Sequence, residues 1–102
     1  MDITDVLTAL AETDEPAAQA SSDAKRLERH LKIVKAQQFI LASGTVAERE
    51  SIAITSDAYQ TAHEQLSEAE AQDLLFRNER STNTMRFDYW RSVNANRRMG
   101  AA

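Results

Sequence analysis

The chain has 102 residues, enough for one domain, and its formal charge of −4 with 27% charged residues is typical of a protein with much water-exposed surface. It contains no cysteine, which excludes disulfides and thiolate metal sites, and no apolar run approaches the roughly 20 residues of a membrane span. Residues 1–5 are acidic, which argues against a secretory signal, so we expect a cytoplasmic protein.

Residues that interrupt helices are rare, because Pro16, Gly44 and Gly100 are the only proline and glycines. The rest is rich in Ala, Glu, Gln, Leu and Arg, which favour helix. We therefore predict one all-α domain over residues 1–102, a coiled-coil-like antiparallel helical hairpin. Its parts are a short acidic amphipathic helix with a linker (1–15), a helix (16–43) and a long helix (45–98).

The first segment carries an apolar stripe at helical spacing, formed by Ile3, Val6, Leu7 and Leu10. Pro16 either ends this short helix or begins the next one. Whether the short helix docks on the rest of the chain stays open at this point.

The second segment has apolar or small polar residues at alternating spacings of four and three, as in a coiled coil: Leu27, Leu31, Val34, Gln38 and Leu41. Lysines and arginines between residues 25 and 35 make its outer face basic. A solvated helix face is the ordinary explanation for such a charge run.

A tight turn is predicted at residues 43–45, where Gly44 can adopt a left-handed conformation that ends a helix. Thr45 and Glu48 have the spacing of a capping box that starts the next helix. The flanking helices then lie antiparallel, with residue i near residue 88 − i. This register sets the basic face at 25–35 beside the acidic stretch at 57–73.

No glycine or proline occurs in residues 45–99, which predicts one uninterrupted rod. Its predicted apolar seam consists of Ile52, Tyr59, Ala62, Leu66, Ala69, Leu74, Leu75 and Phe76. More than half of the rod would extend past its neighbour, leaving several aromatic side chains uncovered. The N-terminal stripe, a bend at residues 81–84 or a second chain could cover them, and we favour a second chain.

The C-terminal arm interleaves arginines with aromatic residues, and we predict that it binds a partner. Burial in a core or self-assembly comes first, a protein interface second and nucleic acid third, because a pI near 5.1 counts against nucleic acid. The predicted partner-binding residues are Arg80, Arg86, Phe87, Tyr89, Trp90, Arg91, Arg97 and Arg98.

No residue pattern indicates catalysis. The chain has no nucleophile elbow and no glycine-rich phosphate loop, and its two histidines, His30 and His63, are far apart. Glu64 and Glu68 share a helix face, but nothing in the sequence indicates a buried setting for them. We expect no enzyme activity, no catalytic residue, no cofactor and no metal site.

The tail at residues 89–98, reading Tyr-Trp-Arg-Ser-Val-Asn-Ala-Asn-Arg-Arg, resembles the ending of small helical bacteriophage and prophage proteins of unknown function, as does the Ala-Glu-Arg-Glu sequence at 47–50. The resemblance covers the C-terminal two thirds. It implies a phage-encoded accessory factor in the host cytoplasm, acting near DNA replication or recombination or against host defence. The aromatic and arginine residues of the arm favour a non-catalytic role in binding a protein partner. The alternatives are a nucleic-acid-binding factor of replication or recombination and a component of virion assembly.

Overall fold

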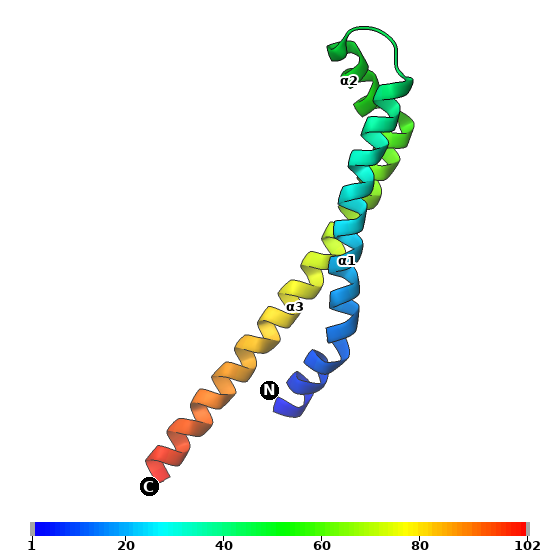
Figure 1. The fold of residues 1–102 in the computed structure, drawn as a ribbon. Coiled ribbons are helices and arrows are strands. Elements are labelled where there is room, and N and C mark those ends of the chain that lie inside the picture. The colour runs from blue at the N-terminus through cyan, green and yellow to red at the C-terminus, as the bar shows by residue number, and fades with distance from the viewer. Residues whose placement is uncertain (1, 102) are drawn as a thin grey trace.

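A computed structural model describes residues 2–101 as three helices, α1 (Ile3–Leu41), α2 (Val46–Thr55) and α3 (Asp57–Ala101). The two long helices α1 and α3 pack side by side as an extended antiparallel hairpin, with α2 at its closed end (Figure 1). The all-α hairpin is thus confirmed. The short helix, however, lies in the middle of the chain, and the predicted short N-terminal helix is wrong.

The hairpin is a thin rod, with extents of 79 × 22 × 15 Å and a radius of gyration of 22.4 Å. A compact domain of this length has a radius of gyration of about 13 Å. Each long helix therefore has one main neighbour, and most of its circumference faces water.

α1 runs continuously through Pro16, so the predicted division at residue 15 is wrong. Asp2 caps it by accepting a hydrogen bond from the backbone N–H of Thr4 at 2.9 Å. Proline in a helix removes one backbone hydrogen bond and bends the axis, and the N-terminal part of α1, blue in Figure 1, bends toward α3. Pro16 itself is exposed, so its ring does not enter the interface with α3.

A heptad seam explains why the helix continues. The α1 residues that recur at alternating spacings of three and four are all buried or half-buried: Ile3, Val6, Leu10, Thr13, Ala17, Ala20, Ala24, Leu27, Leu31, Val34 and Gln38. This phase stays unbroken across Pro16. The packing gained along the whole seam outweighs the one hydrogen bond that proline removes.

The long helix predicted over 45–98 is interrupted at Ser56, which separates α2 from α3. Ser56 has extended backbone angles (φ −66°, ψ 149°). Its N–H donates to the carbonyl of Ala53 at 3.3 Å, and its Oγ accepts from the N–H of Tyr59 at 3.2 Å. One serine thus ends one helix and caps the next. Beyond it, α3 continues through residues 81–84, so the alternative of a bend there is wrong.

The turn between α1 and α2 is confirmed. Gly44 has φ +118°, which residues with a side chain rarely adopt, and Thr45 Oγ1 accepts a hydrogen bond from the N–H of Glu48 at 3.2 Å. The Arg49 guanidinium lies 4.5 Å from the centre of the Phe39 ring, and its Nε donates to the Phe39 carbonyl at 3.3 Å. These contacts fasten the start of α2 to the end of α1.

The register between α1 and α3 is fixed by Arg80, which donates a hydrogen bond to Thr13 at 2.9 Å. Facing residues therefore add to 93, and the predicted sum of 88 is wrong, because α2 and the break at Ser56 interrupt the straight rod that it assumed. The same sum pairs the α1 seam with residues of α3 that are buried or half-buried: Tyr59, Ala62, Leu66, Ala69, Asp73, Phe76, Arg80, Asn83 and Phe87. Ile52, Leu74 and Leu75, which were expected on the seam of the long helix, are exposed, as is Leu41, which was expected on the seam of the second segment.

The core of the rod is made of small side chains. Its buried apolar residues are Val6, Ala20, Ala24, Val34, Ala53, Ala62 and Leu66. Alanines let the two helix backbones approach closely, but each contributes little apolar area. The hairpin therefore gains its stability from length, through many small contacts.

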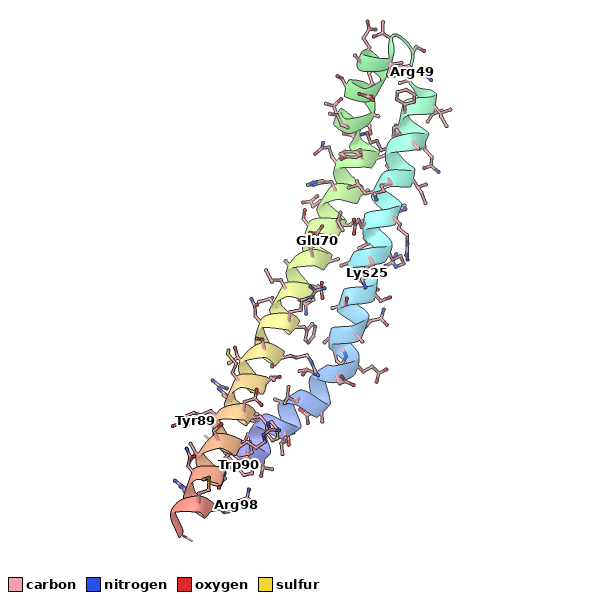
Figure 2. The ribbon with its side chains drawn as sticks, turned by 60° about the vertical axis from the view of Figure 1, so that its left-hand side comes forward. Lys25, Arg49, Glu70, Tyr89, Trp90 and Arg98 are labelled. Atoms are coloured by element: carbon pink, nitrogen blue, oxygen red, sulfur yellow. The ribbon has the colours of Figure 1, made fainter. Side chains whose placement is uncertain are left out.

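The expected pairing of charge blocks does not form. Within residues 2–101 the one ion pair between helices joins Arg80 to Asp14 at 3.3 Å, while the others lie within a single helix. Lys25 and Glu70 lie at a similar level of the hairpin in Figure 2, and both are exposed. Apart from seam residues such as Asp73 and Arg80, most basic and acidic residues occupy outer faces, where water solvates them individually.

Candidate functional site: the C-terminal arm of α3

The C-terminal arm, residues 85–98 of α3, begins beside α1 and extends past it. The register places Ile3, the first residue of α1, opposite Trp90. About 16 Å of α3, residues 91–101, therefore extends beyond α1, at roughly 1.5 Å per residue. The expectation that more than half of the long helix is uncovered is wrong, because the N-terminal part of α1, one of the three alternatives, provides the cover.

Two aromatic residues of the arm form a small cluster with an arginine. The Phe87 and Trp90 rings stack with centroids 6.1 Å apart, and the Arg91 guanidinium lies 5.7 Å from the centre of the Phe87 ring. These residues are three and four positions apart, so one helix turn brings them together. Phe87 is half-buried, and Trp90 remains 37% exposed at the edge of the cover.

Tyr89 lies on a different side of the arm. Figure 2 shows Trp90 toward the N-terminal turns of α1 and Tyr89 directed away from them. Tyr89 is 68% exposed, and its neighbour Met85 is also exposed. A tyrosine with this much free ring area is available for contact with another molecule.

Four arginines of the arm are exposed: Arg86, Arg91, Arg97 and Arg98. Among the residues that the structure describes, none of these guanidinium groups lies within ion-pair distance of a carboxylate, and the arginines that do form ion pairs are Arg26, Arg77 and Arg80. The arm therefore presents a local positive charge on a chain that is acidic overall.

Arg80, the eighth predicted site residue, lies inside the hairpin. Its Nη1 donates to the Leu10 carbonyl at 2.7 Å and to Thr13 Oγ1 at 2.9 Å, while Nη2 lies 3.3 Å from Asp14 Oδ1. These bonds hold α1 at the turn before its bend. Sequence reasoning missed this contact, although polar residues at two seam positions, Thr13 and Arg80, are a signal that could have found it.

An open groove runs between the N-terminal part of α1 and α3. Asp2, Asp5, Val6 and Ala9 line it from one helix, and Leu75, Glu79, Thr82 and Arg86 are among the residues that line it from the other. The sequence analysis did not identify this groove, because it placed the N-terminal segment in a separate helix.

The described residues contain no group of three or more His, Asp or Glu side chains placed to hold a metal ion. No helix within residues 2–101 is long and apolar enough to cross a membrane. No family model, curated protein or solved structure matches the chain.

Proposed function

We propose that this protein is a non-catalytic interaction factor that binds a partner protein through the C-terminal arm of α3. The observation that carries the proposal is the combination of exposed Tyr89 and Trp90 with four arginines on one helix end, none of which has a carboxylate within ion-pair distance among residues 2–101. Trp, Tyr and Arg are the residue types that contribute most to binding energy at protein interfaces.

The aromatic residues and the arginines of the arm have different roles in binding. Tyr89 and Trp90, supported by the stacked Phe87 ring, supply apolar area as anchors. Arg86, Arg91, Arg97 and Arg98 orient an acidic partner surface, since guanidinium groups form two parallel hydrogen bonds with a carboxylate. Arg80 belongs to the fold, because its donors are occupied by α1.

The proposal is tested by replacing Trp90 and Arg91 with alanine, separately and together. The variants are compared with the wild type for capture of partner proteins from a host lysate. Arg29→Ala is the matched control, because Arg29 is also exposed but lies on α1, far from the arm. Loss of binding only in the arm variants is expected, and unchanged binding by folded arm variants would contradict the proposal.

Nucleic-acid binding is the second candidate, and the unpaired arginines beside aromatic rings favour it specifically. Guanidinium groups would contact phosphates while Tyr89 and Trp90 stack on unpaired bases. Fluorescence anisotropy with labelled single- and double-stranded oligonucleotides at low salt tests it. Affinity that falls steeply as salt is added would support this candidate, and no binding at low salt would reject it.

The resemblance of residues 47–50 and 89–98 to phage proteins remains a prediction. If it holds, the partner is a protein of the infected cell or of the phage, and the interaction takes place in the host cytoplasm. A role in virion assembly is the third possibility in the same setting, and it requires assembly of many copies.

A further inference from the structure

A second exposed face of α3 runs beside the seam and is defined by residues three or four positions apart. This side face consists of Glu64, Glu68, Ala71, Leu75, Glu79, Thr82, Arg86, Tyr89, Val93 and Arg97, all exposed except the half-exposed Val93. Its apolar members include Leu75, 64% exposed, and Tyr89, 68% exposed. The seam with α1 occupies a neighbouring sector of the helix, so the side face has no partner helix over most of its length.

The side face is complementary to the side face of a second copy that runs in the opposite direction. If a second α3 is related to the first by a 180° rotation about an axis perpendicular to the helix near residue 84, Leu75 of one copy lies opposite Val93 of the other. The apolar residues at the two ends of the paired segment then meet. The same rotation places Glu79 of one copy within one helix turn of Arg86 of the other. It also places Glu68 of one copy within one helix turn of Arg97 of the other. Acidic residues thus precede the centre and basic residues follow it, which is the pattern that favours an antiparallel pair and penalises a parallel one.

From this pattern we infer that the protein forms a twofold-symmetric dimer in which the side faces of two α3 helices pack antiparallel around residue 84. The inference rests on the proposed function, since Arg86, Tyr89 and Arg97 belong to the arm, and it names a second copy of the chain as one partner. In the dimer each Glu79 pairs with Arg86 of the other copy, so two equivalent ion pairs form.

The surface of the single chain is consistent with such a dimer. Its accessible area is 7472 Å², whereas a compact monomer of 11.4 kDa exposes roughly 5,800 Å². The excess is larger than the ~800 Å² that each partner contributes to a standard interface. Pairing over residues 75–93, about 28 Å of helix, can therefore be accommodated on surface that a compact chain would have buried.

The groove beside α1 adds room for the second helix. Leu75, Glu79, Thr82 and Arg86 line it together with Val6 and Ala9. A neighbouring α3 seated on the side face would also contact the N-terminal part of α1. Arg97 of the neighbouring copy would lie near Glu68 of the first copy, beyond the groove. This contact would favour the same antiparallel orientation.

Charge reversal provides the test, with mass measured by light scattering and sedimentation. The wild type is expected to have twice the 11.4 kDa chain mass. Glu79→Arg or Arg86→Glu alone sets like charges against each other, and each is expected to weaken the dimer about tenfold or more. The double variant Glu79→Arg/Arg86→Glu restores both pairs, and an equimolar mixture of the two single variants is expected to form the mixed dimer preferentially.

Asp88→Arg is the matched control, because nine residues at about 3.6 per turn place Asp88 opposite Glu79 on the helix. This variant is expected to remain a dimer. A wild type that is monomeric, single reversals that leave the dimer unchanged, or a double variant that is not restored would each overturn the inference. Far-ultraviolet circular dichroism verifies that every variant is folded.

The cysteine-free chain permits a test of direction by cross-linking. With a short bismaleimide, Thr82→Cys is expected to cross-link to its own copy and Leu75→Cys is not, whereas a parallel dimer would cross-link both and overturn the inference. The two proposals fail separately. A monomer whose capture of another protein depends on Arg91 leaves only the proposed function standing, because Arg91 lies off the side face.

Discussion

Replacing Arg80 by methionine tests how the N-terminal part of α1 is held against α3. Methionine keeps most of the apolar stem but removes the hydrogen bonds to the Leu10 carbonyl at 2.7 Å and to Thr13 Oγ1 at 2.9 Å. Each bond from a charged donor contributes about 1–1.5 kcal/mol when partly exposed, and the Arg80 side chain is 29% exposed. The ion pair with Asp14 adds at most about 0.5 kcal/mol, because Asp14 is largely exposed. The expected loss is therefore about 2–3 kcal/mol.

The loss should be concentrated in the segment of α1 before its bend. Trp90 is the only tryptophan and faces the first turn of α1, so its fluorescence reports detachment of that segment. Urea denaturation followed by Trp90 fluorescence should show an earlier transition in Arg80→Met. Amide hydrogen exchange should rise in residues 3–14 more than in the middle of the hairpin.

Arg77→Met is the matched control, since Arg77 pairs with Asp73 at 3.1 Å within α3 and is 65% exposed. A pair of this kind contributes about 0.3–0.5 kcal/mol. Thr13→Val removes one of the three acceptors of Arg80 on α1 and should cost about 1 kcal/mol. If Arg80→Met destabilises the protein no more than Arg77→Met, the reasoning about this contact is refuted.

Three further changes probe the ends and breaks of the helices by urea denaturation with circular dichroism. Gly44→Ala should lower the free energy of unfolding by about 1–2 kcal/mol, because φ is +118° and a Cβ would meet the Glu48 side chain. Gly100→Ala is the control and should not destabilise the protein, because there is open space around Gly100. Equal stability of the two variants would contradict the turn geometry. Ser56→Ala should cost about 1 kcal/mol by removing the cap of α3, and an unchanged midpoint would show that the break does not depend on this hydroxyl. Pro16→Ala should add up to about 3 kcal/mol by restoring a helical hydrogen bond, and a loss of stability would show that the bend is needed for packing.

The sequence was sufficient to predict helices, their antiparallel sense and the turn at Gly44, because these follow from local residue preferences. The continuity of α1 could not be predicted from Pro16 alone. A proline signals an end locally, whereas the seam that overrides it becomes visible only when positions before and after it are aligned in one heptad phase. Ser56 shows the opposite error, since this serine ends α2 and caps α3 in a stretch that contains no glycine or proline.

The candidate site was harder to predict than the fold. The exposure of Trp90 depends on how far α1 reaches, and that length depended on the interpretation of Pro16. Arg80 looked like its neighbouring arginines in the sequence, but its seam position gives it three acceptors on α1. The side face became visible only after the register had shown which sector of α3 was already occupied.

A two-helix rod cannot bury most of its large apolar side chains, so exposure alone says little about function here. Ile40 and Leu41 at the closed end are 72% and 76% exposed, although they belong to neither the arm nor the side face. The arm and the side face differ, because exposed apolar residues occur there together with unpaired charges in a definite order. Apolar area promotes association in general, whereas the order of charges determines direction and partner. For this reason the charge-reversal series is more decisive than any removal of an apolar side chain. Dimerisation restored in the double variant cannot be explained by a general change in the tendency of the surface to associate.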